Sequence, residues 1–203
     1  MSRTIIALTG RARAGKDTVA AHLAKAHGFQ TIALADEVRR AALAINPWVC
    51  VEDTHDVLPS LAPVRLAHLV NTMGWDRAKQ IPEVRRLLQT IGTEAGWQIH
   101  GVDLWTSRAD TKIAELAPDT PVVITDARMP HEQLWIDRIG ATVIEIQRPD
   151  NPHELSGTTA THLSEQGGIR AEHVLLNDST KEALYHRIDA LLAQITDHDE
   201  ENH

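Results

Sequence analysis

The chain has 203 residues, of which 42% are hydrophobic and 24% are charged, and its formal net charge is −8. This length and composition predict one globular domain, residues 1–203, around a buried core. The negative balance argues against broad electrostatic attraction to nucleic acid or to anionic lipid, so any affinity for phosphate must come from a local site. We therefore expect neither nucleic acid nor a membrane among its partners.

The cysteine content and the apolar runs indicate the environment. Cys50 is the only cysteine, which excludes an internal disulfide and a zinc site built on several thiolates. No window approaches the ~20 apolar residues of a membrane span, and the first residues lack an apolar signal region. These features predict a soluble protein of a reducing cytoplasm.

The first predicted strand leads directly into a loop that contains two glycines. Residues 4–8 are an apolar run, residues 10–18 read Gly-Arg-Ala-Arg-Ala-Gly-Lys-Asp-Thr, and a helical pattern follows. Gly10 and Gly15 tolerate either sign of φ, so backbone N–H groups can turn inward around an anion, and Lys16 adds a flexible charge. The N-terminus of the next helix directs partial positive charge at the same anion. The segment predicts a phosphate-binding loop with a nucleotide as its ligand.

The residues after Lys16 depart from the usual pattern. A Ser or Thr whose hydroxyl coordinates Mg²⁺ normally follows this lysine, whereas Asp17 stands there and Thr18 comes one residue later. A glycine-rich turn that binds nothing is the alternative interpretation. The position between a strand and a helix favours the phosphate loop.

Short apolar runs bounded by turn residues predict strands that are buried on both faces. They are residues 4–8, 31–34, 121–125, 141–146 and 173–176. Helical patterns lie between them, and the last helix has an apolar stripe and can be capped by Asp178 or Ser179. This alternation predicts an α/β fold with a doubly wound, parallel, five-stranded sheet.

Residues 46–118 lack a comparable strand. They carry helical patterns instead, at residues 64–73, 83–100 and 104–116. We therefore expect this stretch to form a helical insertion beside the sheet.

Charged residues follow two of the predicted strands. Asp126 and Arg128 come after residues 121–125, at the end of a parallel strand where ligands bind. Asp126 is a candidate Mg²⁺ ligand, and Arg128 can bridge phosphates and neutralise the transferring group. Alternatively, Asp126 caps a helix that starts near Pro130. Asp36 follows the second strand, where it can bind a ribose hydroxyl, orient a nucleophile or act as a simple helix N-cap.

Several motifs, in order, resemble those of the phage-type deoxynucleoside monophosphate kinases, which are P-loop kinases related to phosphomevalonate kinase. The matching segments are residues 14–18, 34–36, 88–94, 101–105, 125–132, 147–149, 162–165 and 176–178. The resemblance covers nearly the whole chain, and Asp17 is then the family's own variant. It implies a P-loop NTPase-like fold in which residues 46–118 bind the substrate and residues 149–170 form a lid-like segment over ATP.

The resemblance also implies a reaction, in which the γ-phosphoryl group of ATP passes to the 5′-phosphate of a deoxynucleoside monophosphate (dNMP) to give dNDP and ADP. Both reacting groups are phosphates, so the protein must neutralise charge, align the groups and exclude water. The implied catalytic residues are Lys16, Arg128 and Arg148, and Mg²⁺ would be held near Asp17 and Asp126. The implied ATP-binding residues are Gly10, Arg13, Ala14, Gly15, Lys16, Asp17, Thr18 and Asn177. The implied substrate-binding residues are Asp36, Gln89, Glu94, Asp103, Trp105 and Arg128.

Other interpretations stay open for several of these residues. Asn177, expected near the adenine ring, can equally form a turn. Trp75, Trp97 and Trp105 on amphipathic helices suit a core as well as a ligand contact, and Trp97 replaces a basic residue of the family. The lid has no arginine before Arg170, so closure and His162 would matter more there than charge. The twelve histidines lack metal-ligand spacing and are interpreted as surface residues.

Two rival functions share the phosphate loop. A small-metabolite kinase that acts on phosphomevalonate or dephospho-coenzyme A would keep Lys16, Asp126 and Arg128 and differ in the insertion. A regulatory module would bind nucleotide without catalysis. The resemblance also leaves a homodimer open, and it places a phage-encoded chain in the cytoplasm of the infected host.

Overall fold

The computed structural model describes residues 3–50, 63–149 and 168–201. They divide into two compact units. The first comprises Met1–Leu34 with Ala109–His203, and the second comprises Ala35–Arg108. Each unit has its own hydrophobic core.

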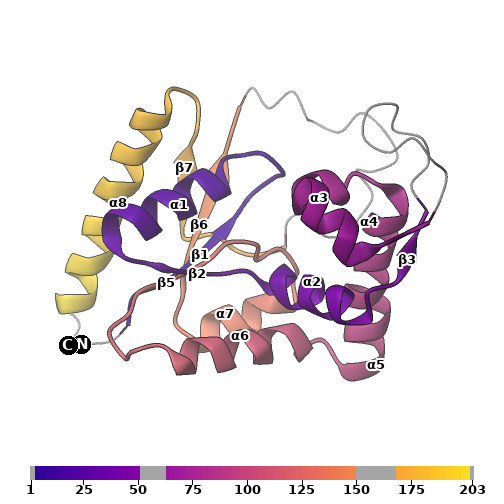
Figure 1. Cartoon of the computed structure of the whole chain (residues 1–203). Helices are drawn as coiled ribbons and strands as arrows, with labels where there is room; N and C mark the ends of the chain where they lie inside the picture. The colour runs from indigo at the N-terminus through magenta and orange to yellow at the C-terminus, as the bar shows by residue number, and fades with distance from the viewer. Residues whose placement is uncertain (1–2, 51–62, 150–167, 202–203) are drawn as a thin grey trace. The chain divides into compact units, whose positions relative to one another are not determined.

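A parallel sheet forms the centre of the first unit (Figure 1). Its strands are β1 (Ile5–Thr9), β2 (Gln30–Ile32), β5 (Val122–Ile124), β6 (Thr142–Gln147) and β7 (His173–Leu176). They lie in the order β2-β5-β1-β6-β7, and each neighbouring pair is parallel. The predicted α/β fold with five parallel strands is therefore confirmed.

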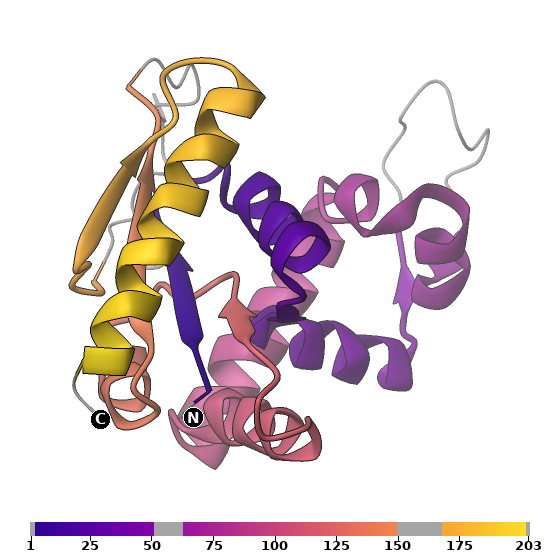
Figure 2. The ribbon, with the colours of Figure 1, turned by 90° about the vertical axis from the view of Figure 1, so that its left-hand side faces the viewer.

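Helices flank this sheet because the connections between parallel strands must cross from one end of the sheet to the other. Within the first unit they are α1 (Lys16–His27), α7 (Glu132–Arg138) and α8 (Lys181–Glu201). Two further helices, α2 (Leu34–Ile45) and α6 (Leu104–Glu115), have residues in both units. Helix α8 packs against α1, as Figure 2 shows.

One face of the sheet packs against α1 and α8. Alternate residues of a strand point to the same face, and Ile6 and Leu8 of β1 meet Ile144 and Ile146 of β6 in this way. The helices contribute apolar residues to the same cluster, namely Val19, Ala20, Leu23, Leu184, Ile188, Leu192 and Ile195. Burial on both faces explains the continuous apolar runs of the central strands β1 and β5, which are buried throughout. The prediction of burial on both faces was wrong for the edge strands, because β2 exposes Gln30 and Thr31 and β7 exposes Val174 and Leu176.

The cap of α8 differs from the prediction. The helix begins at Lys181, and the hydroxyl of Thr180 accepts a hydrogen bond from the Ala183 N–H at 3.2 Å. Thr180 is therefore the N-cap residue rather than Asp178 or Ser179, because it directly precedes Lys181 and its hydroxyl accepts the hydrogen bond from the helix. Asp178 instead forms an ion pair with Arg187 at 2.7 Å.

The second unit is mainly helical. It contains α3 (Leu66–Ala78), α4 (Pro82–Gln89), the π-helix η1 (Thr90–Trp97) and α5 (Gln98–His100). The region has no strand comparable to those of the central sheet, but β3 (Trp48–Val49) and β4 (Val64–Arg65) form a short antiparallel ribbon that the sequence did not indicate. Helix α3 consequently starts at Leu66 and not at residue 64.

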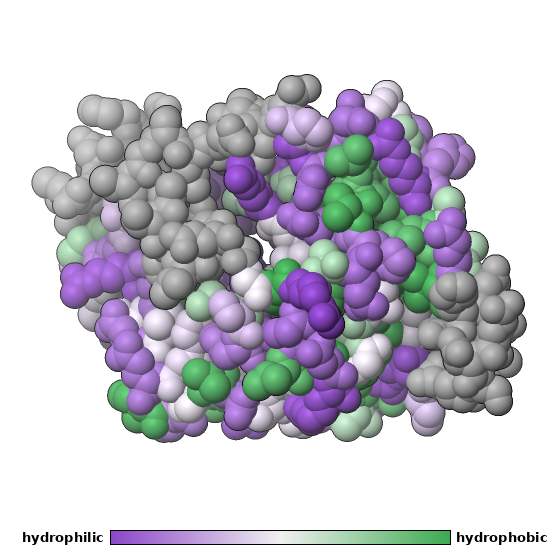
Figure 3. Space-filling view, turned by 180° about the vertical axis from the view of Figure 1, so that it is seen from behind, coloured by the Kyte–Doolittle hydropathy of each residue, from purple (hydrophilic) through white to green (hydrophobic). Residues whose placement is uncertain are grey.

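The outer surface carries several exposed large apolar residues, among them Val174 and Leu176 of β7. On the side that is turned away in Figure 1, Figure 3 shows a mostly hydrophilic surface with hydrophobic residues gathered at the upper right of the view. Among residues 3–50, 63–149 and 168–201, no helix is both long and apolar enough to cross a membrane.

Candidate functional site

Residues 10–15 connect the end of β1 to the start of α1 and form the candidate phosphate loop. Gly10, Arg13 and Gly15 have φ values of 126°, 60° and 115°. A Cβ atom on Gly10 would lie 2.3 Å from the Ile146 carbonyl oxygen, and one on Gly15 would lie 2.6 Å from Asn177 Nδ2. Both positions therefore need glycine for its backbone freedom and for its lack of a side chain.

The side chain of Lys16 lies along this loop. It is buried, with 7% of its surface exposed, and its Nζ donates to the carbonyl oxygens of Gly10 at 2.6 Å and Arg11 at 2.8 Å. Helix α1 begins at Lys16, so the N-terminal amides of this helix lie directly after the loop. The loop thus brings together an ammonium group, a helix N-terminus and a backbone with positive φ at Gly10 and Gly15, which are the components of an anion site.

Asn177, which directly follows the edge strand β7, anchors the phosphate loop. Its backbone N–H extends the β6–β7 ladder by donating to Gln147 O at 2.7 Å, and its Nδ2 donates to Ala14 O at 2.7 Å. The sequence assigned Asn177 to the adenine ring, and that contact stays a prediction. The anchoring of Ala14 was missed, because the two residues are 163 positions apart.

Asp126 follows β5 and caps a helix, although not the expected one. Its Oδ1 accepts a hydrogen bond from the Leu34 N–H, the first residue of α2, at 2.8 Å. The helix near Pro130 is α7, which starts at Glu132 and has no side-chain cap. The carboxylate is half-buried at the edge of the sheet. Capping α2 and holding a metal ion are compatible roles for a group with two oxygens.

Glu132 is a residue of this site that sequence reasoning missed. Its carboxylate accepts hydrogen bonds from the backbone N–H groups of Arg128 at 2.7 Å and Met129 at 3.0 Å. Burial raises the pKa of Glu132 to about 7; the two N–H groups act against this rise, and the charge of Asp126 adds to it. The position of Glu132 at the start of α7, three residues after Met129, was the available signal.

The charged groups of the first unit follow adjacent strands. The phosphate loop follows β1, Asp126 and Arg128 follow β5, and Arg148 follows β6. These three strands are neighbours in the sheet, and they are parallel, so their carboxyl ends share one edge. Arg128 and Arg148 are exposed there. Asp17 is also exposed, in the first turn of α1.

The predicted substrate-binding residues of the second unit are mostly exposed. Gln89 ends α4, Glu94 lies in η1 and Asp103 precedes α6, and all three are exposed. Asp36 lies in the first turn of α2 and pairs with Arg39 at 2.8 Å. It is not an N-cap, because α2 already begins at Leu34.

Trp105 packs inside the second unit. Its Nε1 donates to Gly92 O at 2.9 Å, and a Cβ atom on Gly96 would lie 2.8 Å from its ring. Trp75 and Trp105 both pack against the core of this unit. These contacts support the core interpretation of the two side chains, while a substrate contact of Trp105 stays a prediction.

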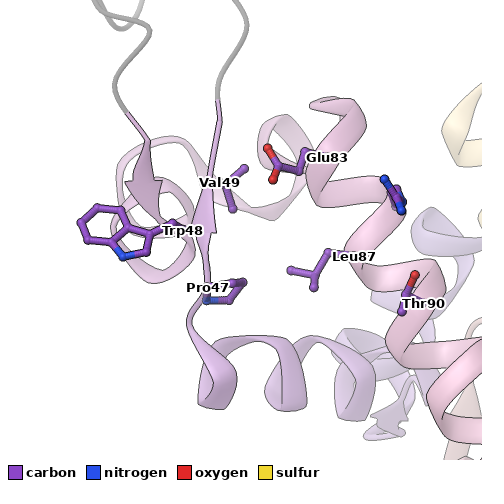
Figure 4. Close-up of a pocket in the computed structure, with 7 residues that line it drawn as sticks. Pro47, Trp48, Val49, Glu83, Leu87 and Thr90 are labelled. Atoms are coloured by element: carbon purple, nitrogen blue, oxygen red, sulfur yellow. The ribbon is translucent and has the colours of Figure 1, made fainter.

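A pocket of about 210 Å³ lies in the second unit (Figure 4). It is lined by Pro47, Trp48, Val49, Glu83, Arg86, Leu87 and Thr90. This lining includes none of the six predicted substrate-binding residues, Asp36, Gln89, Glu94, Asp103, Trp105 and Arg128. The pocket therefore gives those residues no common cavity.

Two further expectations have different outcomes. The interpretation of the histidines as surface residues holds for the exposed His27, whereas the His22 side chain is only 15% exposed. Both histidines contact Asp189, which the sequence did not indicate. Helix packing brought this cluster together, and sequence spacing does not show it. Most of the predicted lid, residues 149–170, lies outside the described residues, and so does His162.

The sequence of the chain matches a known protein family. A family model for deoxynucleotide monophosphate kinase matches residues 65–188, which is more than half of the chain. The matched segment includes Asp126, Arg128 and Asn177 but not the phosphate loop. A comparison with curated proteins found no match.

Solved structures resemble the chain over nearly its whole length. Dephospho-CoA kinase from Campylobacter jejuni has a TM-score of 0.47 and 13% identity, with 95% of this chain and 97% of that chain covered. Shikimate kinase from Aquifex aeolicus has a TM-score of 0.45 and 12% identity, with coverages of 95% and 98%. TT1252 from Thermus thermophilus has a TM-score of 0.43 and 22% identity, with coverages of 96% and 98%. Scores this low support no argument about function.

Proposed function

Because the chain belongs to the deoxynucleotide monophosphate kinase family, we propose that it transfers the γ-phosphoryl group of ATP to the 5′-phosphate of a dNMP. Family membership makes the chain an ATP-dependent phosphotransferase that acts on a nucleoside monophosphate. The proposal adds the deoxyribonucleotide acceptor, the products dNDP and ADP, and the roles of individual residues.

The observation that carries the proposal is the loop between β1 and α1. It lies outside the matched segment, residues 65–188, so it supports nucleotide chemistry independently of the family match. Gly10 and Gly15 shape its backbone, and Lys16 places an ammonium group at its carbonyl oxygens. A loop of this kind binds the phosphate chain of a nucleotide.

The loop residues divide the work of holding ATP. Lys16 leaves its two carbonyl partners to neutralise the β- and γ-phosphates, and Thr18 contacts the α-phosphate. Backbone groups of Arg13, Ala14 and Gly15 surround the phosphates of ATP, and Asn177 keeps Ala14 in place through its 2.7 Å hydrogen bond. A loop that is already fixed loses little entropy when ATP binds.

The arginines act on the group in transfer. An oxygen of the acceptor phosphate attacks the γ-phosphorus, and the bond from that phosphorus to the β–γ bridging oxygen breaks. Arg128 spans donor and acceptor, and Arg148 neutralises charge from the neighbouring strand. The buried carboxylate of Glu132 fixes the backbone of Arg128, which helps to keep the guanidinium in position.

The carboxylates near the loop suit Mg²⁺, which prefers oxygen ligands and keeps several waters. Asp17 is exposed at the start of α1, and Asp126 is half-buried at the end of β5, so both would hold the ion, Asp126 through water. When bound, Mg²⁺ supplies positive charge to the phosphate oxygens. The remaining positive charge comes from Lys16, Arg128 and Arg148.

The base and the sugar of the acceptor are assigned to residues of the second unit. Gln89, Glu94 and Asp103 offer exposed polar groups for the edge of a base or for the sugar. Asp36 can accept a hydrogen bond from a sugar hydroxyl, and the face of Trp105 suits a base.

The proposal is tested by turnover with an acceptor panel and one loop variant. The parent is assayed with ATP and each of the four dNMPs, ribonucleoside monophosphates, phosphomevalonate and dephospho-coenzyme A. Lys16→Ala is expected to lower kcat by about 10²–10³, the loss typical of one preorganised donor. Lys25→Ala, an exposed lysine on the same helix, is the matched control and should leave kcat unchanged.

Two results would contradict the proposal. Phosphorylation of a metabolite and of no dNMP would reassign the acceptor. If the parent transfers phosphate to no acceptor while it binds ATP through Lys16, the chain is a nucleotide-binding module without catalysis.

A further inference from the structure

Three side chains with metal-binding atoms meet between α1 and α8. Nε2 of His22 and Nε2 of His27 each lie 2.7 Å from the same oxygen, Oδ1 of Asp189. The three atoms all lie within 4.8 Å of one another. Such a group has two imidazole nitrogens and one carboxylate oxygen that converge on one point.

The cluster is separate from the proposed active site. His22 is six residues after Lys16, so it lies about 9 Å further along α1, at 1.5 Å per residue. His27 is the last residue of α1, and Gly28 ends the helix with φ 71°. The proposed phosphoryl transfer uses none of the three residues.

A neighbouring aromatic side chain supports the imidazole of His22, while the cluster stays accessible to solvent. The ring of His22 stacks on Tyr185 of α8, with centroids 4.0 Å apart and planes 10° apart. The side chains of His22, His27 and Asp189 are 15%, 32% and 38% exposed. The rings are therefore supported, and an ion can reach them from solvent.

The donor set favours a particular class of ion. Imidazole suits zinc and its neighbours in the transition series, whereas Mg²⁺ and Ca²⁺ prefer sites made of oxygen. Zinc binds nitrogen and carboxylate oxygen at about 2.0–2.2 Å, so tetrahedral ligand atoms lie about 3.3 Å apart. The present 2.7 Å contacts must widen by roughly 0.6 Å when an ion binds.

We propose that His22, His27 and Asp189 bind a divalent transition-metal ion, with Zn²⁺ as the best fit. Three protein ligands leave the fourth tetrahedral position to water. The ion replaces the contacts between imidazole and carboxylate and links α1 to α8. Because α1 begins at the phosphate loop, the link stabilises the helix that carries Lys16.

The test uses the full chain with Mg²⁺ in excess, so that sites made only of oxygen are occupied. Co²⁺ serves as a spectroscopic probe, because tetrahedral Co²⁺ absorbs visible light much more strongly than octahedral Co²⁺. We expect the parent to give the tetrahedral spectrum with one equivalent of Co²⁺ and to lose it when Zn²⁺ is added. This measurement needs no variant, so it does not depend on how a variant folds.

Variants then assign the ligands. His27→Gln and Asp189→Asn should each weaken Zn²⁺ binding by more than about tenfold, since loss of even an outer-shell partner has an effect of that size. His186→Gln removes an exposed histidine of α8 and should leave the affinity unchanged. His198→Gln is the control for metal binding by the C-terminal segment.

Two outcomes would overturn the proposal. One is a parent that gives no tetrahedral Co²⁺ spectrum, which would leave the cluster as a hydrogen-bonded contact between two helices. The other is Zn²⁺ affinity that survives His27→Gln and Asp189→Asn but is lost in His198→Gln.

Discussion

At the scale of single residues, Asn177 shows how one amide group can shape a nucleotide site. Its side chain donates to Ala14 O at 2.7 Å, and its Nδ2 would lie only 2.6 Å from a Cβ atom on residue 15. The phosphate loop therefore depends on a residue of the β7–α8 connection. Reading adenine and holding the loop are different roles, and they predict different kinetics.

We predict that Asn177→Ala weakens ATP and GTP equally. Loss of a net hydrogen bond of about 1 kcal/mol should raise both KM values by roughly fivefold, because the loop serves the phosphates that the two nucleotides share. Steady-state kinetics with both nucleotides measures this, and Asn71→Ala, at an exposed position of α3, is the control. A selective loss for ATP would show that Asn177 reads adenine.

Glu132 carries a second residue-scale prediction, about pH. Burial raises the pKa of Glu132 in the folded chain to about 7, above the ordinary value of 4.5. As the pH rises, the unfolded chain therefore releases this proton at a lower pH than the folded chain does. The facing charged groups are Asp126, which favours this proton, and Arg128, which opposes it. The contribution of Glu132 to stability is therefore present below pH ~4.5 and is lost as pH rises towards 7.

Glu132→Gln should remove this pH dependence. A glutamine keeps an acceptor oxygen for the backbone N–H groups and carries no charge, so it should stabilise the fold above pH ~7 by up to about 3 kcal/mol. Urea denaturation at pH 5 and pH 8 measures the difference, with Glu115→Gln on the exposed face of α6 as the control. Equal effects of Glu132→Gln at both pH values would contradict the assignment.

At the scale of elements, the π-helix η1 is the most unusual segment. Residues 90–97 read Thr-Ile-Gly-Thr-Glu-Ala-Gly-Trp, and they lie between α4 and α5. Gly96 faces the ring of Trp105, and Gly92 accepts the hydrogen bond of its Nε1. The lack of a side chain on Gly96 lets the indole approach this helix closely. π-Helical turns are frequent at functional sites, in agreement with the proposed role of Glu94.

Gly96→Ala should destabilise the second unit. The new methyl would lie 2.8 Å from ring atoms of Trp105, and the ring cannot retreat without losing its bond to Gly92 O. We expect a loss of about 1–3 kcal/mol of unfolding free energy, which is typical of overpacking, measured by urea denaturation. Gly92→Ala is the matched control, because its methyl would meet Val38 at an ordinary 3.6 Å. Equal effects of the two substitutions would refute the packing argument.

The bounds of the strands and helices show which elements could be predicted from local sequence patterns. The central strands β1 and β5 were predictable because strands covered on both faces are continuous apolar runs, and the edge strands β2 and β7 were predictable as short apolar runs between turn residues although they are partly exposed. The short β3–β4 ribbon was not, since its paired segments are two residues each and carry no such run. The cap of α8 was displaced by one residue, because Asp178, Ser179 and Thr180 are all plausible caps by type.

At the scale of the whole molecule, ligand binding should raise thermal stability. A ligand at 100 times its Kd adds about 2.7 kcal/mol, which for this chain length is a rise of roughly 5–10 °C in Tm. We expect such a rise with ATP and with the preferred dNMP. Lys16→Ala should lose most of the ATP effect and keep that of the dNMP. No rise with any dNMP would contradict the proposed acceptor.

The sequence by itself determined the parallel sheet, the glycine-shaped loop after the first strand and the resemblance to the family. Each feature depends on residues that are near one another in the chain. The sheet was predicted from apolar runs that alternate with helical patterns, the loop from the backbone freedom of glycine, and the family from the order of short motifs. The charged residues after β1, β5 and β6 were also predictable, because carboxyl ends of parallel strands share one edge.

Only the tertiary structure decided the contacts between distant segments. It joins Asn177 to Ala14 across 163 positions, Asp126 to the start of α2 across 92, and Asp189 to His22 across 167. It also buries Glu132, which raises the pKa of that carboxyl. These contacts depend on strand order and on how α1 packs against α8, and local sequence patterns carry no information about either.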